Sequence, residues 1–202
     1  LTENYAEALI INADGSAVSY GVENGEYWEN VKGSVIVDGD NITMTFEDND
    51  NLTGHFDIIP GQSFSLYEDS GERYIYQYCA NDLSDEIIGM WVWVDPSGNG
   101  SENMGIQTFN ENGTALFTGG YEEIDYKVNE GTTYKVVGDL LMQNVPNDNP
   151  PYMVRRLTYN TNGASYGAVL TTYSPATNYT ASWLRVKQSL NLADKTYAYN
   201  TA

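Results

Sequence analysis

The sequence predicts an all-β protein built from two copies of one strand pattern, and three observations support this prediction. Turn-forming residue pairs occur at short intervals along the whole chain. A stretch near the N-terminus recurs about 98 residues later. Hydrophobic and polar residues alternate with a period of two, as in β-strands, in short runs that include residues 34–37, 42–46, 91–94 and 183–186.

The turn signals divide the chain into short strands. Asp-Gly and Asn-Gly pairs favour tight hairpins because both central residues of such a turn need positive φ. Many short strands joined by turns every 8–12 residues or so are typical of antiparallel barrels and sandwiches. These pairs, with related Pro-Gly and Gly-Asp pairs, lie at positions 14–15, 38–39, 60–61, 112–113, 138–139 and 162–163.

The internal repeat extends over most of the first eighty residues. A repeat unit of this length is a whole small domain rather than a solenoid unit. At a spacing of 98, Asn12, Gly15 and Ala17 match Asn110, Gly113 and Ala115; at a spacing of 99, Tyr27, Val37 and Gly39 match Tyr126, Val136 and Gly138.

A polar stretch at residues 80–86 marks the boundary between the copies, so we expect a first unit over residues 1–82 and a second over residues 83–202. The second unit opens with an apolar run at residues 87–94, whereas almost nothing precedes Tyr5 in the first. Either the opening strand of the first unit lies outside this sequence, or that unit is incomplete and needs another edge to cover it.

The charge excludes some partners. The chain carries 28 acidic and 9 basic residues, a net charge of −19, which leaves no cationic face for nucleic acid or anionic lipid. No apolar run is long enough to predict membrane insertion. Cys79 is the single cysteine, so it cannot form an intrachain disulfide, and we expect it in a strand as a small buried hydrophobe.

Three residues carry a resemblance to a known family. Gly89 and Trp91 form a Gly-x-Trp motif on the opening strand of the second unit, and Arg185 lies on its last strand. With the strand pattern, this resembles the lipocalin-like domains of exported bacterial proteins. The resemblance implies two tandem lipocalin-like antiparallel β-barrels, or barrel-like sandwiches, with Arg185 stacked on Trp91 at the closed barrel end. It also implies an exported protein, to which a lipid anchor outside this sequence could belong.

The residues needed for common catalytic and metal sites are scarce. His55 is the single histidine and shows no partner for a nucleophile–base pair, and one His with one Cys predicts no zinc site. Among 28 acidic residues some pair can reach glycosidase spacing, so a carboxylate-pair glycoside hydrolase stays as an alternative. Asp48 and Asp50, in the acidic run 47–51, are candidates for calcium, although a solvated turn is the simpler interpretation.

Aromatic residues are the favoured candidates for ligand binding. Exposed Tyr and Trp next to Asp or Asn suit sugar rings, although ordinary cross-strand packing is the competing interpretation for each one. The candidates are Trp28, Tyr27, Trp93, Tyr121, Tyr126, Tyr134 and Tyr152.

The sequence therefore predicts a non-enzymatic, exported binding protein without a cofactor, whose partner is a small molecule or a glycan. An alternative is a surface adhesion or carbohydrate-binding module with a β-sandwich fold. A third is a domain that pairs with another protein through exposed apolar patches. A lipocalin-like binder would line an enclosed cavity with its aromatics, whereas a glycan module would show them on an open face.

Overall fold

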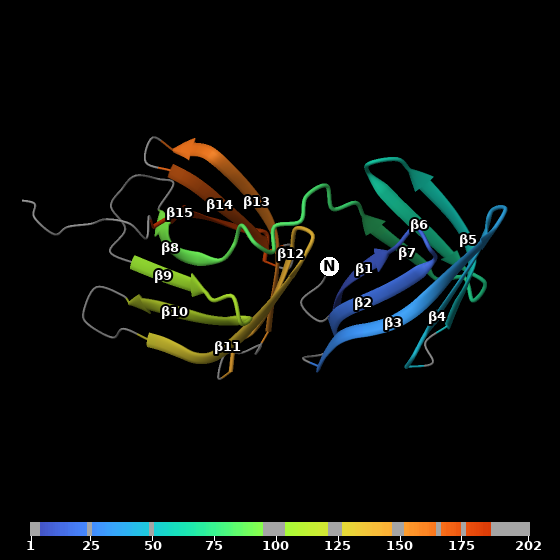
Figure 1. The fold of residues 1–202 in the computed structure, drawn as a ribbon, viewed down its shortest axis with the longest axis horizontal. Helices are drawn as coiled ribbons and strands as arrows, with labels where there is room; N and C mark the ends of the chain where they lie inside the picture. The colour runs from blue at the N-terminus through green and yellow to red at the C-terminus, as the bar shows by residue number, and fades with distance from the viewer. Residues whose placement is uncertain are drawn as a thin grey trace, which may run out of the picture.

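The protein forms two antiparallel sheets that lie side by side (Figure 1). The computed structural model describes residues 5–23, 26–48, 51–94, 104–120, 127–146, 152–164, 167–174 and 177–186. Every regular element in these ranges is a β-strand, so the all-β prediction is confirmed. In the same ranges, no helix has the length and apolar character that crossing a bilayer requires.

The first sheet has seven strands in chain order and is open, with β1 and β7 at its two edges. Each strand is hydrogen bonded to the next through a hairpin, which gives an up-and-down meander curled into a half-barrel. The strands are β1 Tyr5–Ile11, β2 Ser16–Glu23, β3 Glu26–Asp38, β4 Asn41–Phe46, β5 Asn51–Ile59, β6 Ser63–Glu68 and β7 Arg73–Gln77.

The second sheet has eight strands and closes into a barrel. β8 completes the barrel because it is hydrogen bonded to β9 on one side and to β15 on the other. The strands are β8 Gly89–Val94, β9 Met104–Phe109, β10 Thr114–Gly120, β11 Lys127–Val137, β12 Leu140–Asn144, β13 Tyr152–Ala164, β14 Gly167–Ser174 and β15 Tyr179–Arg185.

The expectation of two barrels thus holds for the second unit alone. A sheet closes into a barrel only when its two edge strands are hydrogen bonded, either to each other or through an added strand between them. Among the described strands, none pairs with the outer edge of β1 or of β7, so the first unit is an open sheet. The strand that closes the second unit, β8, lies in the apolar run at residues 87–94.

The first hairpin of each sheet has the same detailed geometry. Gly15 and Gly113 adopt φ values of 82° and 78°, which favour glycine over residues with a Cβ. In both turns an Asn side chain donates to the hydroxyl four residues later, and an Asp or Asn oxygen accepts from that same hydroxyl. These hydrogen bonds join Asn12 to Ser16 (2.9 Å) and Ser16 to Asp14 (2.6 Å), and Asn110 to Thr114 (3.0 Å) and Thr114 to Asn112 (2.7 Å).

The barrel interior is filled with side chains. Its core cluster includes Trp91, Phe109, Leu141, Leu170 and Trp183, all nearly or fully buried. A smaller cluster on the concave face of the first sheet includes Ile42, Met44, Phe46 and Leu66, with aromatic rings packed on it.

Residues 78–88 connect the sheets and pack on the barrel. The Leu83 backbone N–H donates to the Gly138 carbonyl at 2.8 Å, and both Leu83 and Ile87 are buried in the barrel core. These two side chains belong to the barrel, whereas β7 ends at Gln77, which brackets the boundary expected between residues 82 and 83.

The two sheets also touch directly, through β1 and β2 on one side and β11 to β13 on the other. Ala8 packs with Val137, Leu140 and Met142 in one buried cluster. A second cluster joins Ala6 and Val22 of the first sheet to Tyr152 of the barrel. Polar contacts supplement this junction: Arg156 donates to Gln77 at 3.4 Å, and the Lys135 ammonium lies 5.2 Å from the centre of the Tyr20 ring.

Candidate functional site

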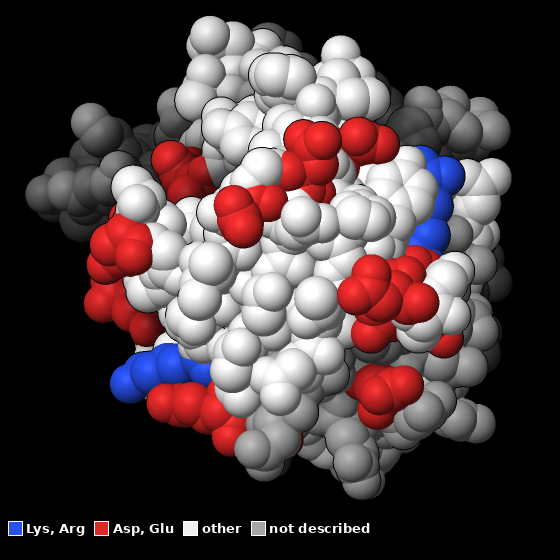
Figure 2. Space-filling model, turned by 90° about the vertical axis from the view of Figure 1, so that its right-hand side faces the viewer, with Lys and Arg blue, Asp and Glu red and all other residues white. Residues whose placement is uncertain are grey.

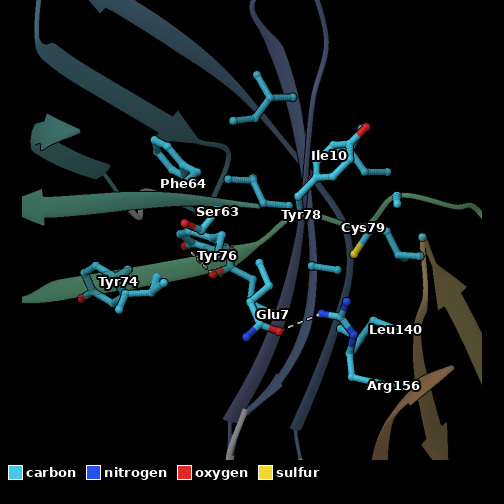
Figure 3. Close-up of a pocket in the computed structure, with 18 of the residues that line it drawn as sticks. Glu7, Ile10, Ser63, Phe64, Tyr74, Tyr76, Tyr78, Cys79, Leu140 and Arg156 are labelled. Atoms are coloured by element: carbon cyan, nitrogen blue, oxygen red, sulfur yellow. Dashed lines mark hydrogen bonds between the residues drawn. The ribbon is translucent and has the colours of Figure 1, made fainter. Parts of the chain in front are cut away.

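A large groove lies between the two edge strands of the first sheet, next to the junction with the barrel (Figure 3). It has a volume of about 1240 Å³, and we call it the seam groove. Its walls include β1 from Ala6 to Ile11 and β7 from Arg73 to Gln77. Apolar side chains dominate it, among them Ile10, Ile11, Ile58, Phe64, Ile75 and Tyr78.

The alternation of β1 decides which of its side chains face the half-barrel interior. Ala6 and Ala8 are buried against the barrel of the second unit. Because side chains alternate between the faces of a strand, Glu7 and Leu9 point to the other side, where Leu9 packs on the core of the first sheet. The small side chains of Ala6 and Ala8 allow the barrel to approach β1 closely.

A hydrogen-bond network forms the polar centre of the groove. One carboxylate oxygen of Glu7 accepts from the Ser19 hydroxyl at 2.8 Å, and the other accepts from the Tyr76 hydroxyl at 2.9 Å. The Trp28 indole N–H donates to the same Ser19 oxygen at 2.9 Å. Glu7 is on β1 and Tyr76 is on β7, so their hydrogen bond spans the opening between the two edges.

Aromatic rings line the groove beside this network. The Phe64 ring lies 5.7 Å from that of Tyr76 and is stacked on it, and Phe56 lies 6.1 Å from Phe64. Tyr74 and Tyr76 are half-buried on alternate positions of β7, and Tyr78, just after the strand, is exposed. A ligand in the groove would therefore meet aromatic faces on one side and the Glu7 carboxylate on the other.

One end of the first sheet exposes paired apolar residues. β1, β3 and β5 all run toward this end, since neighbouring strands are antiparallel. Isolated exposed apolar residues are common, but a cluster of them at one end is a mark of a binding surface. The pairs and their exposed fractions are Ile10 (40%) and Ile11 (45%), Ile36 (65%) and Val37 (56%), and Ile58 (60%) and Ile59 (53%).

The charges of this unit are spread around its face. Figure 2 shows Asp and Glu side chains surrounding an uncharged central area on the face opposite the barrel, with few Lys or Arg side chains. At the barrel side of the groove, Arg156 is paired with Asp139 at 2.6 Å. The groove is thus mostly apolar, with the Glu7 carboxylate at its centre and Arg156 on its barrel side.

Cys79 lies at the barrel end of the groove. It follows β7 rather than lying in the strand, so the strand prediction for Cys79 is wrong by two residues. Burial raises the pKa of the Cys79 thiol, which is half-buried against the β11–β12 turn. A Cβ added to Gly138 would come within 2.6 Å of the Cys79 Cβ, so glycine at this turn permits the close packing.

The aromatic candidates whose side chains the structure describes do not gather at one surface. Trp93 and Tyr134 pack against the barrel core, where the Tyr134 ring lies 4.9 Å from that of Phe109. Burial raises the pKa of Tyr134, whose hydroxyl donates to the Asn110 carbonyl at 2.8 Å. Tyr152 is buried at the junction between the sheets.

Among the candidates whose side chains the structure describes, Trp28 is the one near the groove, and its indole N–H donates to Ser19 of the groove network. Its ring lies over Gly21, where an added Cβ would meet ring atoms at 2.1 Å. The side chain of Tyr27 is outside the described part of the structure, and so are Tyr121 and Tyr126.

Trp91 and Arg185 lie together, in the pairing that the lipocalin-like resemblance implies. The Arg185 guanidinium lies 5.6 Å from the centre of the Trp91 ring and donates to the Ile88 carbonyl at 2.8 Å. The Trp91 indole N–H donates to the Ile87 carbonyl at 2.7 Å. In the first sheet, Arg73 instead lies over the ring of Tyr67, at 5.0 Å.

The candidates for catalysis and metal binding stand apart from the groove. His55 is exposed on β5. Within the part of the chain that the structure describes, no three His, Cys, Asp or Glu side chains are grouped so as to hold a metal ion. Of the two calcium candidates, Asp48 lies in the turn after β4 and Asp50 is outside the described residues.

Comparison of the chain with protein-family models, with curated proteins and with solved structures finds no match.

The groove is not predicted by the sequence patterns described above, although two features of the sequence are related to it. The pairs Ile10-Ile11, Ile36-Val37 and Ile58-Ile59 break the period-two alternation just before a turn, where one of the two residues cannot face the core. Tyr74, Tyr76 and Tyr78 occupy alternate positions along the edge strand β7 and just after it. These features indicate a groove only once it is known that β7 has no second partner among the described strands.

Proposed function

We propose that the chain is a non-enzymatic binding protein whose ligand site is the seam groove. The observation that carries this proposal is a groove of about 1240 Å³, mostly apolar, that opens between β1 and β7 around one polar centre. Ligand sites are characteristically concave and apolar, with a few polar groups that fix orientation. Both oxygens of Glu7 accept structural hydrogen bonds, which suits a binding role better than proton transfer.

The proposed ligand is an apolar or amphipathic molecule of elongated shape. The groove exceeds the volume of about 300–1000 Å³ typical of sites for small molecules. Its length follows two strands, so a ligand that fills it would extend along β1 and β7. A glycan is the second candidate, supported by the Tyr78 side chain, which is 60% exposed and could stack against a sugar ring.

We also propose that the two units are copies of one lipocalin-like module. The matched first hairpins support this, since Gly15 and Gly113 share a conformation and donate, through their backbone N–H groups, to the equivalent carbonyls of Asn12 and Asn110 at 3.0 Å. Gly39 and Gly138, another pair from the sequence repeat, both adopt φ of 61°. In both units the Asp after this glycine accepts, through its carbonyl, a backbone hydrogen bond from a strand further on, Phe56 in one and Leu157 in the other.

The test of the binding site is a fluorescence titration with N-phenyl-1-naphthylamine, an apolar probe whose emission rises in apolar sites. The probe is neutral, so the net charge of −19 does not repel it. The matched variants are Ile10→Ser, which changes the groove, and Ile36→Ser, which changes an equally placed isoleucine outside it. Both isoleucines are exposed one or two residues before their strands end, so neither change should unfold the sheet.

We expect saturable binding by the parent chain, weaker binding by Ile10→Ser and unchanged binding by Ile36→Ser. Loss of one isoleucine contact should weaken the affinity by about tenfold, as a buried aliphatic side chain contributes about 1.5–3 kcal/mol. Equal binding by both variants would place the probe elsewhere and contradict the proposal.

A further inference from the structure

The barrel holds a strand at the place where the first sheet is open. From β9 to β15 the barrel strands follow one another in chain order, as β1 to β7 do in the first sheet. β8 lies between β9 and β15 and is antiparallel to both. β1 and β7 therefore occupy the positions of β9 and β15, and the seam groove occupies the position of β8.

The two edges have the directions that a shared partner requires. Every neighbouring pair in the first sheet is antiparallel, so β1 and β7, separated by five intervening strands, run in the same direction. One inserted strand can thus be antiparallel to both, as β8 is in the barrel. Each edge strand is hydrogen bonded to a single neighbour among the described strands, and a sheet edge presents N–H and C=O groups to a new strand.

The groove also offers the side-chain contacts that a strand would make on its inner face. In the barrel, Trp91 points inward from β8 and its ring meets that of Tyr159 edge-on at 6.2 Å. In the first sheet, Phe64 and Tyr76 form a stacked pair on the groove wall. An inserted strand with apolar side chains at alternate positions would cover this pair.

A second element of the barrel also has no counterpart in the described part of the first sheet. Leu83 and Ile87, just before β8, fill the end of the barrel where β9 ends. At the corresponding end of the first sheet, Ile10, Ile11, Ile58 and Ile59 are between 40% and 60% exposed. A polypeptide that supplied two apolar residues before its strand would cover them in the same way.

Charge favours a particular kind of donor. The chain carries a net charge of −19, so a segment with basic flanks would be attracted and an acidic one repelled. This also disfavours a second copy of the same acidic chain as the donor.

We propose that the seam groove binds an extended segment of another polypeptide, with apolar residues at alternate positions and basic flanks, as an eighth strand between β1 and β7. The inference rests on the proposed function, because it names the ligand class of the same groove. Binding would close the first sheet into a barrel through main-chain hydrogen bonds to both edges, with side-chain pockets giving selectivity.

The probe for this inference is a synthetic peptide with the sequence of residues 83–94 and two lysines added at each end. These residues contain both elements that the first sheet lacks, the apolar pair Leu83 and Ile87 and the strand β8. The control peptide is methylated on every second backbone nitrogen of the strand. It keeps every side chain but cannot form the hydrogen bonds to one of the two edges.

Hydrogen–deuterium exchange of the intact chain, with and without peptide, reads out the two edges separately. We expect exchange to slow by about tenfold or more in both Tyr5–Ile11 and Arg73–Gln77, because an amide in a ladder hydrogen bond exchanges only when the pair opens. The methylated peptide should leave at least one edge unprotected and bind more weakly.

The other outcomes separate the two proposals. A peptide that displaces N-phenyl-1-naphthylamine without protecting the edges would overturn the strand insertion and leave the groove as a binding site. Protection of one edge alone would overturn closure, and failure of the peptide to bind while the probe still binds would overturn the polypeptide ligand. If neither binds, both proposals fail. Protection that rises with protein concentration in the absence of peptide would assign the groove to a second copy and overturn the inference.

Discussion

The barrel and the open sheet have the same succession of hairpins, yet their apolar residues have different surroundings. In the barrel, Trp91 on β8 and Ile87 in the segment before it are completely buried. In the open sheet, the isoleucine pairs at the strand ends stay largely exposed and a groove runs along the seam. The difference indicates that one added strand, with the turn before it, determines whether such a sheet encloses a buried core or leaves an open groove.

The two sheets also differ in how they use arginine and aromatic residues. Arg185 closes the barrel end by stacking on Trp91 and donating to a backbone carbonyl. Arg73 stacks on Tyr67, at the hairpin between β6 and β7, and lies on the border of the seam groove. Arg185 thus contacts a buried ring of the barrel core, whereas Arg73 contacts a ring beside the groove.

The largest expected effect is that of removing a fully buried side chain from the barrel core. Trp91→Ala should destabilise the barrel by about 3–5 kcal/mol, because it empties a fully buried site. Hydrogen exchange should then speed up in β8, β9 and β15 and change little in β3 to β6. Equal acceleration in both sheets would show that they unfold as one unit.

The next largest effect tests whether the first hairpins of the two sheets are structurally equivalent. Gly15→Ala and Gly113→Ala each force a Cβ into a left-handed backbone and should cost about 1–3 kcal/mol. Gly15→Ala should cost more, because its Cβ would lie 3.0 Å from the Val35 carbonyl oxygen, whereas that of Gly113 would lie 3.5 Å from the Tyr134 oxygen. Urea denaturation measures both. A cost at one glycine alone would weaken the proposal that the units are copies.

These hairpins could be predicted from the sequence, whereas the groove could not. Gly15 and Gly113 follow Asp or Asn in local turn signals, and both turns form where the sequence predicts them. Trp91 and Arg185 were paired by resemblance and lie together in the structure. Local pattern suffices for such features because a turn depends on a few adjacent residues.

The aromatic candidates show why the site escaped prediction. Whether a Tyr or Trp is core or surface depends on which strand faces it, and that is set by pairing between distant strands. Tyr152 is buried because β1 and β2 pack on it from the other unit. Glu7 and Tyr76 form the groove centre across 69 residues, a contact that strand periodicity cannot indicate.

A smaller effect compares the two arginines. Arg185→Ala should cost about 0.5–1 kcal/mol for the exposed cation–π contact, and about 1 kcal/mol more for the hydrogen bond to Ile88. Arg73→Ala should lose only its cation–π contact with Tyr67, at a cost of about 0.5–1 kcal/mol. Urea midpoints of the two variants measure the difference, and Arg185→Lys serves as the control that keeps the charge. A larger loss for Arg73→Ala would contradict the role given to Arg185.

The smallest effect is a pH dependence confined to the barrel. Burial raises the pKa of Tyr134 in the folded chain, so its neutral form is favoured there. The resulting contribution to stability is complete below pH 10 or so, the ordinary pKa of tyrosine, and is lost as the pH rises through the folded pKa. Tyr134→Phe should lack this alkaline loss while also losing, at every pH, the hydrogen bond to Asn110.

Because other tyrosines titrate in the same range, the quantity to measure is the difference in unfolding free energy between the parent chain and Tyr134→Phe from pH 8 to about pH 11. The advantage of the parent chain should shrink as the pH rises. A difference that stays constant would show that partial burial does not raise the pKa of Tyr134 in the folded chain.

The central claim, that the first sheet is open at the seam, is tested most directly by hydrogen exchange of the chain without any ligand. The account predicts that amides of β7, Arg73–Gln77, exchange much faster than those of β15, Tyr179–Arg185, although both follow the last hairpin of their sheet. β15 has a partner on each side, whereas β7 is hydrogen bonded to β6 alone among the described strands. Equally slow exchange in the two strands would mean that β7 already has a second partner, and it would contradict the open seam.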